Sequence, residues 1–436
     1  MGIYSYEEAF GCADKTSQPM RQAIAEWFAA YYGREADSGD DPCQRVAYAV
    51  VSKLVRTVFG EYRSASEDGF CRKVLKRLDQ KARQAMEMSL VGGECYIKPC
   101  PGDGEFQFHL IPRNHVLIFG RAADGELTDV GTAERSVHGR CYYTLLERRT
   151  VDENGYLTIQ NRLFRSYNPQ SLGAEVPLGA CPDYAGFAPE YRYETPVGSV
   201  GLVQLRTPML NCVDGSADGV SVFAPAMGLI RAIDENEGQL RGEFTRGQSR
   251  IIASRDLLRE DENGAKSLAD HLFVGLDDDP EQVGITIFSP ELRHEAYLER
   301  KQEYLRNVES VIGLKRGMLS DANVEDRTAT EIASSAGDYN LTVMDFQRVW
   351  GLAVEKTLWL CLCLGRLYGL AGVPENSDVA IDWGNGILYD EDKTWQDYQG
   401  MVASGLLKPE IALGWRFNMP ADTEEDRTAI RQRLMP

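Results

Sequence analysis

Two stretches of this 436-residue chain carry narrow apolar stripes at heptad-like spacing, separated by an insertion of about forty residues. The stripe residues are Phe223, Ile230, Ile233, Leu240 and Phe244 in the first stretch, and Leu298, Leu305, Val308 and Ile312 in the second. Steps of three and four residues predict helices, and a second helix that returns after an insertion makes an antiparallel pair with the first. Narrow stripes suggest contact with neighbouring chains. The spacing alone slightly favours a plain helical hairpin inside one globular domain.

The first 200 residues mix helical and strand patterns. Apolar residues recur at helical spacing over 18–32, from residue 46 to residue 58, and over 67–90. Alternating segments at 95–98, 106–110, 116–119, 141–147 and 156–159 predict strands, with Asn154-Gly155 as a hairpin turn. The Gly- and Pro-rich stretch 173–201 is predicted to be a long loop. This mixture of helices and strands predicts the α+β class.

The insertion and the C-terminal part show weaker patterns. Short strands are expected at 250–254 and 284–288, on either side of an acidic, loop-rich stretch. After Gly313 a polar loop covers 315–327, and its glycines and polar residues favour a flexible connection. A long helix over 328–367, a strand at 379–383, two small helices (390–404 and 408–415) and a polar tail complete the chain.

No catalytic or metal-binding motif is present in the sequence. It lacks a nucleophile elbow, a phosphate-binding glycine loop and an HExxH pair, and its acidic runs lie in polar loops. His109, His115 and His138 have no activated serine or cysteine nearby in the sequence. We therefore expect no catalytic residue, metal or cofactor, although a hydrolase triad assembled from distant residues stays open.

Composition limits the environment and the partners. The net charge of −19 argues against a protein that reads DNA sequence, but an acidic channel wall would keep DNA from sticking. Ten scattered cysteines and an early Glu7-Glu8 pair, without a secretion signal, predict a reduced cytosolic protein. No apolar run approaches the roughly 18 residues of a membrane span.

Ten short segments together carry a family signature. They are Lys53–Leu54, Val58–Glu61, Tyr143–Glu147, Gly219–Ala226, Leu229–Asp234, Glu243–Ile251, Gly313–Leu314 with Gly317, Thr328–Ile332, Ile381–Trp383 and Val402–Leu407. These segments resemble the portal proteins of siphophages that infect Gram-positive bacteria, and they keep the family's order from about residue 20 to about residue 430.

The resemblance implies a portal fold with an α/β wing, two antiparallel stem helices, a small β-containing clip and a small helical crown. The wing would cover residues 1–220 and 313–385, including a tunnel loop within 314–327. The stem helices would be 221–247 and 291–312, the clip 248–290 and the crown 386–436.

The resemblance also implies a function. A ring of about twelve copies would form the DNA channel at one capsid vertex, for genome packaging and ejection. It would be assembled in the bacterial cytoplasm, and no membrane is involved. Its partners would be double-stranded DNA, the terminase large subunit, a head-completion or adaptor protein, and the major capsid and scaffolding proteins.

Three cations of the tunnel loop are candidates for DNA contact. Lys315, Arg316 and Arg327 would touch phosphate without reading bases. Ordinary solvation explains any one of them equally well. A capsid-associated adaptor or minor structural protein remains an alternative for the whole chain, as does a cytosolic hydrolase.

Overall fold

A computed structural model gives the fold of the chain. It describes residues 3–33, 42–102, 105–123, 125–247, 250–253, 258–260, 266–268, 285–288, 291–321, 329–384, 391–417, 419, 421 and 423–434. The chain forms two compact units. One contains Met1–Trp27, Val51–Val222 and Ala336–Pro436, and the other contains Phe28–Val50 and Phe223–Ser335. Helices and antiparallel sheets both occur, which confirms the α+β class.

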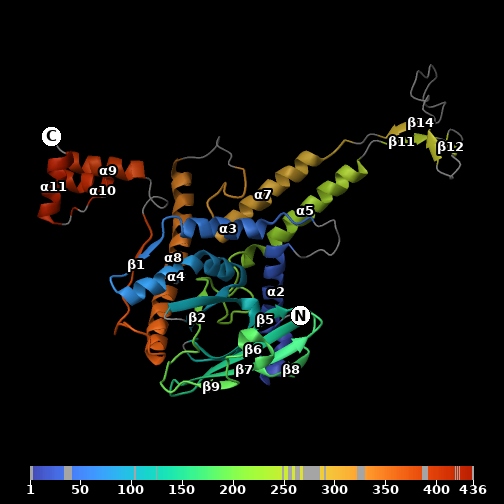
Figure 1. The fold of residues 1–436 in the computed structure, drawn as a ribbon. Coiled ribbons are helices and arrows are strands. Elements are labelled where there is room, and N and C mark those ends of the chain that lie inside the picture. The colour runs from blue at the N-terminus through green and yellow to red at the C-terminus, as the bar shows by residue number, and fades with distance from the viewer. Residues whose placement is uncertain are drawn as a thin grey trace. The chain divides into compact units, whose positions relative to one another are not determined.

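A six-stranded sheet dominates the first unit (Figure 1). Its strands are β4 (Val116–Arg121), β5 (Leu127–His138), β6 (Cys141–Val151), β7 (Leu157–Ser166) and β8 (Ala174–Val176), in that order, with β9 (Glu190–Arg192) also paired to β7. A second sheet joins β10 (Val203–Arg206), β2 (Glu94–Gly102) and β3 (Glu105–Pro112). Short helices α1 (Glu7–Phe10) and α2 (Gln18–Tyr32) precede α3 (Val46–Val58).

Helix α4 (Gly69–Gly92) begins and ends at clear local signals. The Asp68 carboxylate accepts hydrogen bonds from the backbone amides of Phe70 and Cys71, both at 2.8 Å, and so caps the first turn. Gly93 ends the helix with φ 80°, and a Cβ atom there would lie 2.3 Å from the carbonyl oxygen of Gly219. Only glycine fits this close approach of two backbones.

Two expectations about this part of the chain need correction, and strand β5 was not predicted from the sequence. The stretch 173–201 is not one long loop, because it contains β8, β9 and two short 3-10 turns, η3 (Leu178–Ala180) and η4 (Pro182–Tyr184). In the β6–β7 turn only Gly155 has a positive φ, and the Asp152 carboxylate organises a five-residue loop by accepting from the amides of Asn154 and Tyr156.

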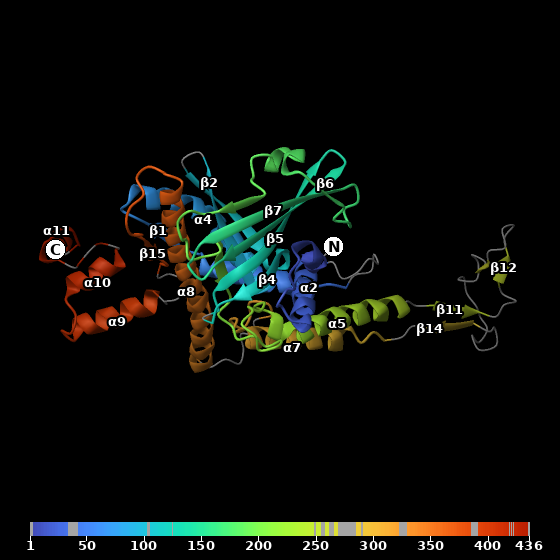
Figure 2. The ribbon, with the colours of Figure 1, turned by 90° about the horizontal axis from the view of Figure 1, so that it is seen from below.

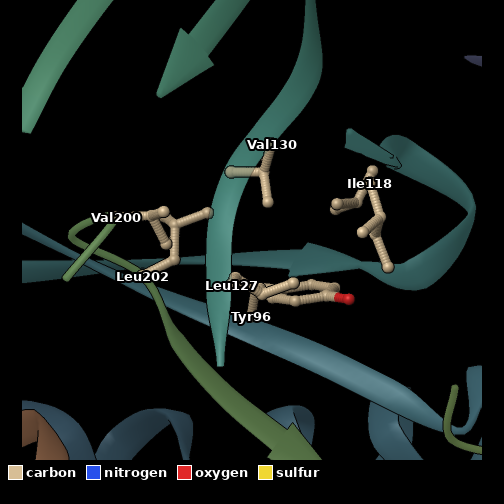
Figure 3. Close-up of a cluster of buried hydrophobic side chains, with 7 residues drawn as sticks. Tyr96, Ile118, Leu127, Val130, Val200 and Leu202 are labelled. Atoms are coloured by element: carbon tan, nitrogen blue, oxygen red, sulfur yellow. The ribbon is translucent and has the colours of Figure 1, made fainter. Parts of the chain in front are cut away.

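Buried apolar side chains join the six-stranded and the three-stranded sheets of this unit. One cluster gathers side chains from β2, β4, β5 and the segment before β10, as Figure 3 shows. Its buried members are Tyr96, Val116, Ile118, Leu127, Val130, Val200 and Leu202. Burying such side chains stabilises a fold by about 1.5–3 kcal/mol each.

A cluster of buried charges lies beside this apolar core. The side chains of Glu94 and Arg113 are fully buried, and Arg113 Nε lies 3.5 Å from Glu94 Oε2. Arg121 pairs with Asp218 at 2.7 Å and lies 3.6 Å from Glu94. Glu94 also accepts hydrogen bonds from the hydroxyl of Tyr96 and, at 2.7 Å, from the amide of Gly219. Burial alone would raise the pKa of Glu94, but Arg113 and Arg121 hold it below its usual value.

A second buried carboxylate, Glu147, bridges two cations. Lys98 Nζ donates to both of its oxygens at 2.9 and 2.8 Å, and Arg149 Nε donates at 2.7 Å. Burial would raise the pKa of Glu147, yet Arg149 and Lys98 outweigh burial and lower this pKa to about 2. These two ion pairs thus favour the folded state at neutral pH.

This depressed pKa predicts the acid sensitivity of the fold. The stabilisation is complete above the ordinary carboxyl pKa of about 4.3 and is lost as the pH falls towards the folded-state value. Glu147→Gln should lower the free energy of unfolding at neutral pH by about 3 kcal/mol and flatten its decline under acid. Urea unfolding at several pH values measures both effects. Glu153→Gln, on the exposed turn, should follow wild type, and parallel acid curves for wild type and Glu147→Gln would contradict the assignment.

The C-terminal part combines one long helix with small elements. Helix α8 (Ala329–Leu367) is followed by β15 (Ala380–Asp382), which pairs with β1 (Arg63–Ala65). Helices α9 (Glu391–Ala403) and α10 (Pro409–Arg416) match the two small helices expected there. The expected polar tail contains a helix that was not predicted, α11 (Glu424–Leu434). Among the described helices, none has both the length and the apolar character needed to cross a bilayer.

Candidate nucleic-acid interface

Two antiparallel helices form the body of the second unit. Helices α5 (Met227–Arg246) and α7 (His294–Ile312) lie side by side in both views (Figures 1 and 2). The start of α7 meets the end of α5, where Arg293 donates to both carboxylate oxygens of Glu243 at 3.1 and 2.9 Å. The first helix begins later than the expected residue 221, because Pro225 lies in a 3-10 turn, η5 (Ala224–Ala226), that precedes it.

The apolar stripes are buried near the start of α5 and the end of α7. Seven of the nine stripe residues are at most 9% exposed: Phe223, Ile230, Ile233, Leu240, Leu305, Val308 and Ile312. The other two, Phe244 and Leu298, are 49% and 48% exposed. They lie near the opposite end of the hairpin, so this end presents apolar side chains on its surface.

Polar contacts join the helices towards that opposite end. Asn236, fully buried in α5, donates to the carbonyl of Tyr297 at 3.0 Å and accepts from Arg300 at 2.8 Å. Arg300 also donates to Gln239 at 2.7 Å, and Lys301 pairs with Glu237 at 3.0 Å. A buried amide with both partners satisfied fixes the register of two helices, because sliding would leave it unpaired.

Short strands lie between the two helices in the sequence. β11 (Arg250–Ala253) pairs antiparallel with β14 (Ile285–Phe288), which confirms the two predicted strands of the insertion. β12 (Leu258–Glu260) pairs with β13 (Lys266–Leu268), on either side of Asn263-Gly264, whose own residues lie outside the described part. Figure 2 shows the β11–β14 pair beyond the end of α5.

The loop after α7 is folded around one buried carboxylate. Glu309, 1% exposed, accepts hydrogen bonds from the amides of Gly317 (3.1 Å), Leu319 and Ser320 (2.9 Å), and from the Ser320 hydroxyl (2.8 Å). Gly313 ends α7 with φ 77°, and the next amide, Leu314, returns to the Glu309 carbonyl at 2.8 Å. Residues 313–321 are therefore held by hydrogen bonds, where the sequence predicted a flexible connection.

The two cations of this segment stand on a tight turn. The amide of Met318 donates to the carbonyl of Lys315 at 3.2 Å, and Gly317 has φ 88°, a value that favours glycine. Lys315 and Arg316 are exposed, and within the described part of the chain neither forms an ion pair. Arg327, the third predicted cation, lies outside the described residues.

This arrangement presents positive charge at the surface. Among the described residues the two cations have no ion-pair partner, which leaves both available to an anionic group such as a phosphate. Sequence analysis found the cations but missed Glu309. Its only signal was a carboxylate directly beside the apolar stripe residue Val308, a position that a surface charge occupies equally well.

Comparison with known proteins adds an independent finding. A family model described as "Phage portal protein, SPP1 Gp6-like" matches residues 74–427. This range includes both helices of the hairpin, the strands between them and the loop that carries Lys315 and Arg316. A comparison with curated proteins gives no match.

Proposed function

The chain belongs to the phage portal protein family of the SPP1 Gp6-like type, and from this premise we propose that its helical hairpin lines the DNA channel of a closed ring. Proteins of this family are structural components of the virion capsid and act in DNA packaging. The portal function therefore replaces the adaptor and hydrolase alternatives. The host type proposed here, a Gram-positive bacterium, rests on the sequence resemblance.

The proposed parts follow the order of elements. Helices α5 and α7 would be the stem, β11 to β14 the clip, and the six-stranded sheet part of the wing. Helices α9 to α11 would form the crown, and the turn at Lys315–Met318 would belong to the tunnel loop. The clip would dock the terminase large subunit during packaging and a head-completion protein afterwards. The wing would face the major capsid and scaffolding proteins, with assembly in the host cytoplasm.

The observation that carries the ring is apolar surface left open on long helices. Phe244 and Leu298 are half-exposed on the hairpin. Helix α8 buries one face through Val343, Phe346, Trp350, Val354 and Leu358. It exposes a second apolar row at helical spacing, formed by Leu341, Met344, Leu352 and Trp359. A helix that is apolar on two faces is usually covered on both, and neighbouring copies of the chain would provide the second cover.

Electron microscopy of the purified chain tests this ring. We expect closed rings of about twelve copies with a central hole, because a head-to-tail interface that closes gives a cyclic assembly. A double variant, Phe244→Glu and Leu298→Glu, should shift the assembly towards monomers while its circular dichroism stays that of wild type. Leu210→Glu, at a 92% exposed position outside the hairpin, is the matched control. A stable wild-type monomer at micromolar concentration in every buffer would refute the ring.

In the ring, the loop cations would make weak contacts to phosphate. The chain carries 66 acidic against 47 basic residues, so the wall as a whole repels DNA. A few exposed cations repeated around the ring would hold DNA centred without binding it tightly.

Replacing Lys315, Arg316 and Arg327 together by alanine tests this contact. Rings should remain intact, because none of the buried stripe residues changes. We expect shorter packaged DNA, independent of its sequence, with a deficit that shrinks as salt screens the wild-type contacts. Packaged DNA length in wild-type and variant phage is the measurement. Unchanged packaging with intact rings would make these cations ordinary surface residues.

A further inference from the structure

Three side chains with metal-binding atoms meet at one end of the six-stranded sheet. His138 is the last residue of β5, while Cys181 and Asp183 lie in the segment of η3 and η4. The ligand atoms of all three lie within 4.8 Å of one another. His138 Nε2 and Asp183 Oδ2 are 2.8 Å apart, and both side chains reach solvent, with 39% and 48% of their surface exposed.

A buried apolar cluster and two hydrogen bonds hold this site in place. Cys181 is fully buried in a cluster with Tyr143, Leu145, Leu163, Leu178 and Tyr184. The Tyr184 amide donates to the Cys181 carbonyl at 3.1 Å, and the Tyr184 hydroxyl is 2.9 Å from the hydroxyl of Ser136 on β5. Strand β5, which carries His138, and the η3–η4 segment, which carries Cys181 and Asp183, are thus already joined. The Cys181 thiol is the buried member of the three ligand groups.

We propose that His138 Nε2, Cys181 Sγ and an Asp183 carboxylate oxygen bind a zinc ion, with water as the fourth ligand. The set combines a soft thiolate, an imidazole and a carboxylate, which suits Zn²⁺ and disfavours Mg²⁺ and Ca²⁺, since these prefer oxygen ligands alone.

The three ligand atoms must move slightly to reach the distances that zinc coordination requires. Ligand atoms at 2.0–2.3 Å from zinc are about 3.3–3.8 Å apart. The His138 and Asp183 side chains would separate slightly and approach the thiol by about 1 Å, which their exposed positions permit. Binding releases the thiol proton, and His138 offers the Nε2 lone pair to the ion with its ring proton on Nδ1. The ion then ties the η3–η4 segment to the end of β5.

Metal titration of the full chain after chelator treatment tests the site. We expect one Zn²⁺ per chain and a higher melting temperature with zinc than with chelator. Replacing zinc by Co²⁺ should give the near-ultraviolet charge-transfer band of a cobalt–thiolate bond. Cys181→Ser should abolish this band, and His138→Ala, a surface change that should spare folding, should weaken zinc binding at least about 100-fold.

Two other cysteines serve as controls. Cys212→Ser removes an exposed thiol elsewhere and should leave zinc affinity and the cobalt band unchanged. Cys141 pairs with His138 in the β5–β6 register and packs against the same cluster as Cys181. A band lost in Cys141→Ser but kept in Cys181→Ser would overturn the assignment. Equal zinc affinity in wild type, His138→Ala and Cys181→Ser would overturn it as well.

Discussion

Replacing Glu94 by alanine is expected to lower the free energy of unfolding by about 3–5 kcal/mol. Glu94 and Arg113 are both fully buried, and the substitution leaves the guanidinium without this counter-charge in a site that water cannot reach. It also removes the acceptor for the Tyr96 hydroxyl and the Gly219 amide. Removing one partner of a buried ion pair lowers the free energy of unfolding strongly, whereas replacing both partners by well-packed apolar residues is often neutral.

Chemical denaturation of wild type and variant measures this loss. Glu105→Ala is the matched control, because Glu105 pairs with Arg77 on the surface, where both side chains are about half-exposed. Solvent already screens that pair, so its removal should leave the denaturation midpoint unchanged. If Glu94→Ala and Glu105→Ala shift the midpoint equally, the buried charge cluster does not stabilise the fold as expected here.

Replacing Glu309 by alanine is expected to release the loop 313–321 while the helical hairpin survives. The carboxylate accepts three backbone amides and one hydroxyl, and charge-assisted hydrogen bonds of this kind contribute about 1.5–3 kcal/mol each. Even a net loss of about 2–4 kcal/mol would speed hydrogen exchange at the Gly317, Leu319 and Ser320 amides about 30-fold or more. Mass-spectrometric hydrogen exchange of the purified protein measures this local opening.

The same variant should impair packaging, since the turn that carries Lys315 and Arg316 would lose its fixed position. Glu309→Gln keeps the shape but turns an NH₂ group towards backbone donors, so we expect an intermediate effect. Glu303→Ala is the control, since Glu303 lies on the same helix and is exposed. Unchanged exchange at the three amides in Glu309→Ala would show that the loop has another anchor.

Strongly periodic helices were predictable, and weakly apolar strands were not. The stripe residues from Ile230 to Ile312 fix one face of α5 and α7, so the hairpin follows from the sequence. Strand β5 contains Thr128, Asp129, Glu134 and Arg135 among few apolar residues, and pairing with β4 and β6 makes it a strand. Such tertiary pairing leaves little local trace in a sequence.

The candidate sites likewise contain residues that could be predicted from the sequence and residues that could not. Lys315 and Arg316 were visible as cations in an acidic chain, because charge can be read residue by residue. The role of Glu309 requires knowing that residues eight to eleven positions later turn back onto it. His138 and Cys181 are distant in the sequence, and the successive pairing of β5, β6, β7 and β8 brings their segments together.

In the loop after α7, the groups that fix the backbone conformation are different from the side chains that reach solvent. The hydrogen bonds to the Glu309 carboxylate come from the backbone and Ser320, and the side chains at positions 315 and 316 take no part in them. Substitutions at these two positions therefore leave the anchor intact. In the proposed channel, a lineage could exchange lysine, arginine or a neutral residue there and adjust the contact with DNA in single mutational steps, without redesigning the turn.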